Sequence, residues 1–390
     1  MKSMHTIVRG ARRTQSAPLA NGPAIEMAAE SEVRIEFDDL DRREVAMVRR
    51  EEDVIALAPA MPMRLVEPAD SHATTPGESG DVAWGVKAVR ADTAKATGAG
   101  VVVAVLDTGI ALGHQAFVGL DIVRRNFTAE ADDDLHGHGT HCAGTIFGRR
   151  VGGVRIGVAP GVPRALIGKV LGAGGGSSDR IVEAMLWAAG EGADVISMSL
   201  GMDFPGYARR LRESGMPEEL AVSRALEGYR ANVMLFERLV ALLHARPKPT
   251  LVVAAAGNES RRELDLNFEI AVSPPATSVG IVSVAALGRR SDGSLGVARF
   301  SNTGASISGP GVEIVSAGMH DDLQTMSGTS MAAPHVAGVA ALWAQRLREQ
   351  GNLTLLNLTG RLIGQAIFHG LQPGIDPSDV GAGLTIAPQE

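Results

Sequence analysis

The chain has 390 residues, of which 45% are hydrophobic and 21% are charged, a composition typical of a globular protein with one large domain and room for a small appendage. A formal net charge of −7, without any basic stripe interleaved with aromatic residues, argues against a nucleic-acid partner. No apolar run reaches the roughly 18 residues of a membrane span, so no membrane partner is expected. The single cysteine, Cys142, cannot form an internal disulfide.

The first 83 residues predict a tail, a small domain and a linker. Residues 1–30 are basic but lack the apolar run of a secretory signal, so we expect a disordered tail. Residues 31–66 have the pattern of strand, helix and strand, which predicts a small β-α-β segment. Residues 67–83 are rich in Pro, Gly, Ser and Thr, which is typical of a linker. The lack of a signal and of disulfides favours a cytoplasmic location over secretion.

Residues 84–390 alternate between short apolar runs and helical patterns, which predicts one large domain. Continuous apolar runs of strand length are typical of strands buried on both faces of a parallel sheet. Their alternation with helices predicts an α/β fold with a doubly wound, mostly parallel sheet and helices on both faces, in which ligands bind at the carboxyl ends of the strands. The apolar runs lie at residues 100–107, 164–171, 193–200, 250–258 and 280–287, and the helical patterns at residues 140–147, 179–191, 217–245 and 329–348.

Four polar side chains lie where these strands end or where a helix begins. Asp107 closes the run GVVVAVLD, Asn258 follows the run TLVVAAAG, and His138 lies in DLHGHGTHCAGT. Ser330 opens a helix of small residues that suits burial, so that its hydroxyl and backbone N–H would face a cleft. In isolation Asp107 would be a turn residue and Ser330 a helix cap. Together the four follow the order acid, base, oxyanion donor and nucleophile.

Five segments of the chain resemble, in order, the signature segments of the subtilisin-like serine proteases, the peptidase S8 family. They are AVLDTGI, HGHGTHCAG, SMSLG, AAAGN and GTSMAAPHVAG, and the histidine segment is most similar to the proteinase K branch. The resemblance covers about residues 84–347 and implies a subtilisin-like fold and a serine endopeptidase that forms an acyl-enzyme. It implies that Asp107 is the acid and His138 the general base, with Ser330 as nucleophile and Asn258 as oxyanion donor.

The three histidines of HGHGTH also permit a zinc site, because closely spaced histidines are common zinc ligands. The motif resembles the HxHxDH motif of metallo-β-lactamase-type hydrolases, but Thr140 stands where that motif has its aspartate. We therefore expect no metal here and a solvent-facing loop position for His136. By the resemblance to subtilases, His141 and Cys142 pack on a buried helix.

No cofactor is expected, although many subtilases bind structural calcium. Where the strong site of the family draws on Asp and Asn side chains, this sequence has Ala116 and Val151, so the resemblance implies that this site is lacking. The run ADDDL, residues 131–135, would hold a cation weakly or be a solvated acidic cluster.

The resemblance also locates the peptide substrate. GAGGGSS and SLG resemble the edge segments between which subtilases hold an extended peptide as an added strand. GAGGGSS lacks the Gly-Lys-Ser/Thr end of a phosphate loop, which disfavours that alternative. Small residues next to Asn258, together with Glu259, would border a primary specificity pocket that favours large apolar side chains. The neighbouring Arg261 and Arg262 would modify this preference. The expected substrate-binding residues are Gly172, Gly174, Gly175, Ser199, Leu200, Gly201, Ala255 and Gly257.

The segment of residues 31–66, a small α+β unit, resembles a shortened subtilase propeptide. Its tail, PMRLV, would lie through the cleft with Leu65 or Val66 at the scissile position. We expect this segment to act as an intramolecular inhibitor until it is cut. The alternative is a purely structural extra domain.

The segment of residues 202–249 is longer than the corresponding segment usually is in the subtilase family. A charged loop at residues 204–215 would lie near the cleft and restrict access to it, and a long amphipathic helix follows. Two alternative functions are considered. One is a protease-shaped scaffold or binding protein whose own tail closes the cleft, and the other is a zinc hydrolase. The complete set of four polar residues favours an endopeptidase for peptide or protein substrates.

Overall fold

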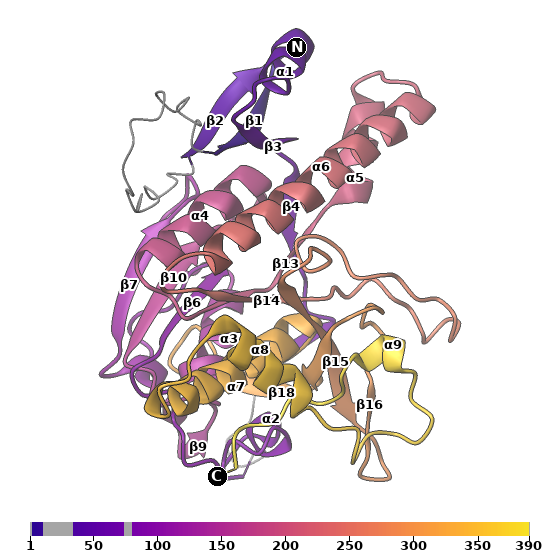
Figure 1. The fold of residues 1–390 in the computed structure, drawn as a ribbon. Helices are drawn as coiled ribbons and strands as arrows, with labels where there is room; N and C mark the ends of the chain where they lie inside the picture. Colours follow the sequence, from indigo (N-terminus) through magenta and orange to yellow (C-terminus); the bar gives the residue numbers. More distant parts are fainter. Residues whose placement is uncertain (1, 11–33, 74–79, 390) are drawn as a thin grey trace, which may run out of the picture.

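The computed structural model describes residues 2–10, 34–73 and 80–389. The strands of the large sheet are β6 (Val102–Asp107), β7 (Asp121–Asn126), β10 (Arg164–Lys169), β12 (Val195–Met198), β14 (Leu251–Ala255), β15 (Ile281–Arg289), β16 (Leu295–Val297) and β17 (Ile307–Pro310). Their order is β16-β15-β14-β12-β6-β10-β7, with β17 beside β15 (Figure 1). All neighbours run parallel except β15 and β16.

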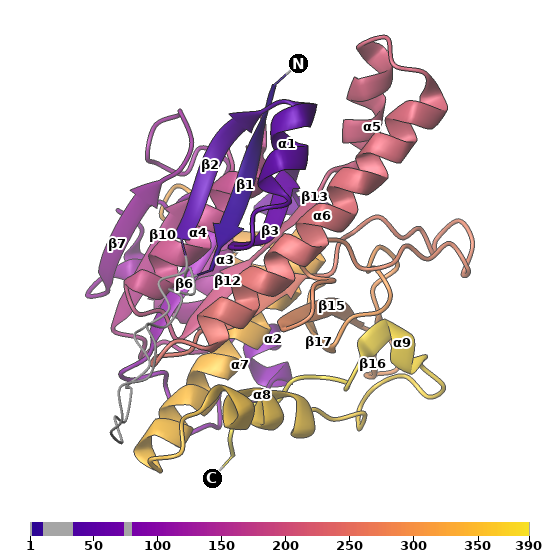
Figure 2. The same cartoon turned by 45° about the horizontal axis from the view of Figure 1, so that its top comes forward.

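Helices cover both faces of this sheet (Figures 1 and 2). The helices of the large domain are α2 (Trp84–Ala88), α3 (His138–Phe147), α4 (Ser178–Gly190), α5 (Phe204–Glu213), α6 (Glu218–His244), α7 (Thr329–Glu349), α8 (Leu355–Gly364) and α9 (Pro377–Val380). Of these, α5 packs on α6 and not on the sheet. In β6, Val103 and Val105 belong to the core shared with α3 and α7, whereas Ala104 and Leu106 belong to the core shared with α4 and α6. Because neither face of the strand meets water, its sequence is apolar up to the final residue, Asp107.

The predicted α/β class, with a doubly wound and mostly parallel sheet, is confirmed. One local prediction is wrong, because residues 204–213 form the helix α5 and not a loop. The Asp203 carboxylate caps this helix by accepting the N–H of Gly206, a proline lies in its first turn, and arginines lie in its last turn. Each of these features stabilises a short helix at its ends.

The N-terminal domain is an antiparallel sheet with the order β2-β1-β3, which packs on α6 through β3 (Figure 2). Its elements are β1 (Ser3–Arg9), β2 (Arg34–Leu40), α1 (Arg42–Val48) and β3 (Val54–Pro59). The prediction of a disordered tail at residues 1–30 is therefore wrong for residues 3–9. The rest of that prediction, and residues 31–33 of the expected β-α-β segment, fall almost entirely outside the described residues.

The central strand β1 is held by both apolar and charged contacts. Ile7 packs with Leu40 in a small core of this domain, and Val8 joins the larger core that contains α6. Arg9 forms ion pairs with Glu36, Glu51 and Asp53 at 2.5 to 2.9 Å. These partners lie far away in the sequence, so the basic character of the first residues did not reveal a strand.

The expected linker also contains regular structure. β5 (Asp70–Ala73) pairs antiparallel with β19 (Leu323–Ser327), which in turn pairs with β18 (Ile314–Ala317). Residues 74–79 of the linker lie outside the described residues. The remaining short elements are η1 (Gln115–Phe117), β8 (Arg150–Val151) and β9 (Val154–Arg155). Among the described residues, no helix combines the length and the apolar character needed to cross a membrane.

Candidate active site

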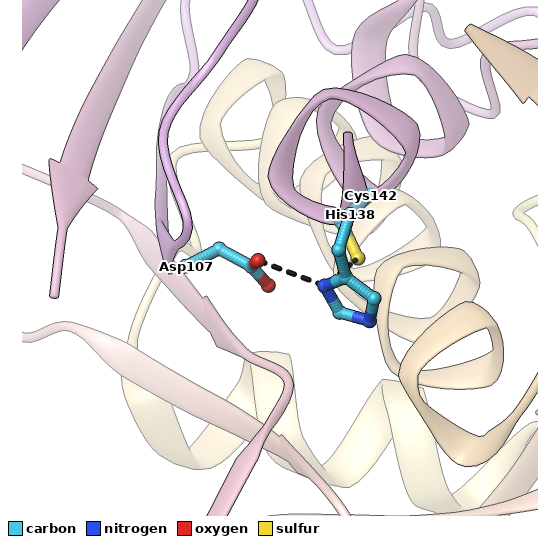
Figure 3. A group of neighbouring side chains, drawn as sticks. All are labelled: Asp107, His138 and Cys142. Carbon is cyan, nitrogen blue, oxygen red and sulfur yellow. Dashed lines mark hydrogen bonds and ion pairs between the residues drawn. The ribbon is translucent and has the colours of Figure 1, made fainter. Parts of the chain in front are cut away.

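A buried carboxylate and a buried imidazole meet at the carboxyl end of the sheet. Asp107 is the last residue of β6, and His138 is the first residue of α3. Their side chains are 1% and 0% exposed, and His138 Nδ1 lies 2.8 Å from Asp107 Oδ1 (Figure 3). Nε2 of His138 has no hydrogen-bond partner among the described residues and is left available.

The start of α3 is fixed by Asp134, a residue that the sequence did not single out. Its buried carboxylate accepts the backbone N–H groups of His136, Gly137 and Thr140 at 2.9 to 3.0 Å. It also accepts the hydroxyl of Thr108, the neighbour of Asp107. Burial alone would raise the pKa of Asp134, but these hydrogen bonds lower it. Asp134 therefore ties the helix that carries His138 to the strand that carries Asp107.

The ionisation of His138 is set by two opposing effects. Complete burial is the largest effect and lowers its pKa, but the adjacent carboxylate of Asp107 raises it, and the result is a pKa well above that of a free imidazole. The imidazolium is therefore stabilised by Asp107, as a base that must take up a proton requires.

Ser330 lies at the N-terminus of α7, which packs against α3. Cys142 joins the two helices, because its sulfur lies 3.8 Å from His138 Nδ1 and 3.3 Å from the carbonyl oxygen of Ser330. The sequence implied only a packing role for Cys142. The hydroxyl of Ser330 donates to the carbonyl oxygen of Val66 at 2.8 Å. The nucleophile candidate therefore faces a peptide carbonyl.

Asn258 is the fourth predicted residue at this place. Its Oδ1 accepts the backbone N–H and the hydroxyl of Thr329, each at 2.9 Å, which turns the amide group toward the cleft. Nδ2 then donates to the carbonyl oxygen of Glu67 at 2.8 Å. Gly257 makes this turn feasible, because its φ is 114° and a Cβ would lie 2.3 Å from Asn302. Ser330 and Asn258 thus contact one stretch of chain, and Cys142 connects the Asp107–His138 pair to the backbone of Ser330.

That stretch begins with β4 (Pro62–Leu65), which lies as the middle strand between β11 (Gly176–Ser177) and β13 (Leu200–Met202). Leu65 is opposite Leu200, and Met63 is opposite both Gly176 and Met202. The side chains of Met63 and Leu65 are only 2% and 8% exposed. The N-terminal segment therefore occupies the cleft as an added antiparallel strand.

The predicted peptide-binding residues are only partly in the expected places. Ser199 and the strand β13 contact the N-terminal segment, and the N–H of Val66 donates to the carbonyl of Ser199 at 3.3 Å. On the other side, Gly172 and Gly175 bond to each other in a tight turn, and pairing with β4 begins only at Gly176. The backbone of Gly175 still approaches Met63, but Gly174 has open space next to it. Ala255 shares the apolar core with Val66.

The histidines of HGHGTH do not converge on one point. His136 is exposed, and its ring centroid lies 6.2 Å from that of His138. His141 is buried with Nε2 at the carbonyl oxygens of Ile314 and Gln324, and burial lowers its pKa to about 3. The ligand-type atoms that do cluster among the described residues, within 4.8 Å, belong to Asp107, His138 and Cys142. This arrangement does not fit a zinc site built from the three histidines.

The acidic run at residues 131–135 makes its contacts within the chain. The buried ammonium of Lys169 donates to the carbonyl oxygens of Ala131 and Asp133 at 2.7 and 2.8 Å. Asp132 accepts the amide of Asn126. Arg262, which we expected to modify the specificity pocket, is also engaged elsewhere, in a buried ion pair with Asp379.

The sequence is similar to those of known proteins over most of its length. The profile of the Subtilase family matches residues 98–383. An alkaline protease of Alkalihalobacillus alcalophilus is 32% identical over 350 residues, which cover 87% of this chain and 79% of that protein. A cuticle-degrading serine protease of Arthrobotrys oligospora is 31% identical over 318 residues, 76% of this chain and 66% of that protein.

A third relative, subtilisin DY of Bacillus licheniformis, is 30% identical over 297 residues, which cover 74% of this chain and 95% of that protein. The resemblance drawn from the five sequence segments is therefore confirmed. The chain belongs to the subtilase family and is a serine-type endopeptidase.

Proposed function

We propose that this endopeptidase cleaves peptide bonds with Asp107 as acid, His138 as base and Ser330 as nucleophile. The observation that carries the proposal is a peptide segment lying in the cleft with its carbonyl groups on Ser330 Oγ and Asn258 Nδ2. Acyl transfer needs these two groups, a nucleophilic hydroxyl and an oxyanion donor, next to the peptide backbone. The buried Asp107–His138 pair at 2.8 Å, which Cys142 connects to the carbonyl group of Ser330, would supply the base.

In the proposed reaction, Ser330 Oγ forms a bond to the substrate carbonyl carbon while its proton passes to Nε2 of His138. Asp107 accepts the hydrogen bond of Nδ1 and stabilises the imidazolium. Asn258 Nδ2 donates to the oxyanion, together with the backbone N–H of Ser330. His138 then returns the proton to the leaving amine as the C–N bond breaks. Water repeats the sequence on the acyl-enzyme and restores Ser330.

A fluorophosphonate probe tests this proposal directly. A protein with an opened cleft, in which Met63→Asp weakens docking of the N-terminal segment, should be labelled on Ser330 and on no other residue, because only a hydroxyl next to a base attacks phosphorus rapidly. Peptide mapping by mass spectrometry locates the label, and the Ser330→Ala and heat-denatured proteins are the controls. Labelling that persists in Ser330→Ala would mean that another residue is the nucleophile.

We also propose that the N-terminal segment inhibits the enzyme in the same molecule until it is cut after Val66. β4 fills the peptide-binding strand position, and the side chain of Val66 is 3% exposed next to Ser330. A substrate cannot pair with β11 and β13 while β4 lies between them. The segment therefore competes with every substrate at an effective concentration that no free peptide reaches.

The segment is bound so that attack is disfavoured. Ser330 contacts the carbonyl of Val66, whereas Asn258 holds the carbonyl of the next residue, Glu67. Transition-state stabilisation requires the nucleophile and the oxyanion donor to act on one and the same carbonyl group. Cleavage after Val66 therefore requires its carbonyl to replace that of Glu67 at Asn258 Nδ2. Until this shift occurs, the segment is an inhibitor and not a substrate.

Met63→Asp should raise the activity of the full-length protein toward a small peptide substrate about 10- to 100-fold. Met63 is 2% exposed in the cleft, and its burial contributes about 1.5 to 3 kcal/mol to docking of the segment, before the cost of a buried carboxylate. Initial rates with a peptidyl coumarin amide measure the change. Met47→Asp, at a 61% exposed position of the same domain, is the matched control. Equal rates for the two folded variants would contradict inhibition by this segment.

A further inference from the structure

Arg64 is the cationic residue of β4, the strand that lies in the cleft. It lies opposite Gly201 in β13, between the buried residues Met63 and Leu65, but its own side chain is 44% exposed. Val66, whose carbonyl accepts the hydroxyl of Ser330, is two residues further on. Arg64 therefore occupies the position of the third residue before the bond that would be cut.

Two carboxylates from different parts of the chain meet this guanidinium. Oε1 of Glu259 lies 2.8 Å from one terminal nitrogen of Arg64, and Oδ1 of Asp203 lies 3.5 Å from the other. Asp203 follows β13, and Glu259 follows the Gly257–Asn258 turn after β14. The two acids thus come from different segments of the large domain and meet at one side chain of β4.

Both acids are held in place by contacts that do not involve the segment. Oε2 of Glu259 accepts the amide of the buried residue Asn302 at 2.7 Å, which leaves Oε1 free for Arg64. The carboxylate of Asp203 caps α5 through the N–H of Gly206 at 3.1 Å. In the described part of the chain, no other cationic group lies within 4.0 Å of either carboxylate. When the segment leaves, two oriented negative charges face an empty position.

We propose that Asp203 and Glu259 form a subsite that selects a basic side chain, arginine above lysine, at the third residue before the scissile bond of a peptide substrate. The inference rests on the proposed endopeptidase function of the cleft. Arginine is favoured because its planar guanidinium presents two nitrogens that reach both carboxylates, whereas the single ammonium of lysine reaches one. In this view, Arg64 makes the N-terminal segment a mimic of the preferred substrate.

A peptide series that copies residues 61–66 tests the subsite. The substrates are Met-Pro-Met-Xaa-Leu-Val coumarin amides with Arg, Lys, Gln or Glu as Xaa, and the enzyme is the full-length protein. Docking of the N-terminal segment slows the hydrolysis of all four substrates by the same factor. This factor cancels when the kcat/KM values of two substrates are divided. We expect Arg to exceed Gln by roughly three- to tenfold at low salt, with Glu lowest, since each partly exposed ion pair contributes little. The preference should shrink at about 1 M salt through screening.

The double variant Asp203→Asn/Glu259→Gln should bring the Arg-to-Gln ratio below about twofold. Both replacements retain an acceptor oxygen for Gly206 and Asn302. Glu263→Gln, on the exposed loop beyond Glu259, removes the same kind of charge away from Arg64 and should leave the ratio unchanged. Equal hydrolysis of the Arg and Gln peptides by the wild type, or a preference that survives in the double variant, would overturn the subsite.

Failure of the proposed function gives a different result, because then no peptide of the series is cleaved. Binding decides the inference in that case. Fluorescein-labelled peptides without the coumarin group are titrated against the full-length Ser330→Ala protein, followed by anisotropy. A three- to tenfold lower Kd for the Arg peptide than for the Gln peptide supports the subsite. Equal Kd values overturn it.

Discussion

Ser330→Ala should lower kcat by about 10⁶-fold, which is the size of the loss in subtilisin, another member of this family, when its nucleophile is removed. The loss is so large because the hydroxyl is the group that forms the acyl-enzyme, and neither the Asp107–His138 pair nor Asn258 can replace it. The comparison is made in the Met63→Asp background, where the cleft is open, with single-turnover rates on a peptidyl coumarin amide.

The same substitution has a second readout. If the enzyme cuts its own segment, Ser330→Ala should keep residues 1–66 attached, as seen in the intact mass after prolonged incubation. Far-ultraviolet circular dichroism should match the wild type, because alanine in place of Ser330 removes the hydrogen bond to Val66 but leaves α7 in place. A variant that loses the segment as fast as the wild type would rule out self-processing.

Asp107→Asn should lower kcat by about 10⁴-fold, because an amide cannot hold the imidazole in the required tautomer or stabilise its positive charge. It should also change the pH dependence. In the wild type the pKa of His138 is raised, so kcat/KM is low at acid pH and rises with pH through a midpoint above about 6.5. Without Asp107, burial remains and lowers the pKa, so the midpoint moves to lower pH.

The direction in which stability changes with pH follows from the same raised pKa of His138. A folded-state pKa above the unfolded one stabilises the protein below the unfolded pKa, and this contribution is lost as the pH rises through the folded value. Asp132→Asn is the matched control, because it removes an exposed charge near the site without touching His138. If the residual activity of Asp107→Asn kept the wild-type midpoint, Asp107 would not be the group that sets the pKa of His138.

The large domain and its four central site residues could be predicted because their signals are local. The strands that precede Asp107 and Asn258 are buried on both faces, which gives unbroken apolar runs, and the polar residues follow directly after them. The small residues of α7 likewise indicate a helix that is buried, and it is buried from Thr329 to Leu342. These patterns need no knowledge of distant parts of the chain.

The features that sequence reasoning missed depend on distant partners. Arg9 lies in the strand β1 and forms ion pairs with three acids, and none of these acids is within 25 residues of it in the sequence. Asp134 looked like one of several solvated aspartates, but it is buried and ties α3 to Thr108. The pair of Asp203 and Glu259 could not be recognised either, since only the fold brings the two carboxylates to Arg64.

The pairing of β5 with β19 adds a second anchor on the far side of the nucleophile. Upstream of Val66 the segment is held by β11 and β13, and downstream the N–H of Ala69 donates to the carbonyl of Ser327 before β5 begins. After cleavage between Val66 and Glu67, both of the new chain termini would therefore remain bound to the large domain. Cleavage after Val66 and dissociation of the N-terminal segment are thus separate steps. After cleavage, the protein would remain an inactive two-chain molecule until the upstream fragment is displaced.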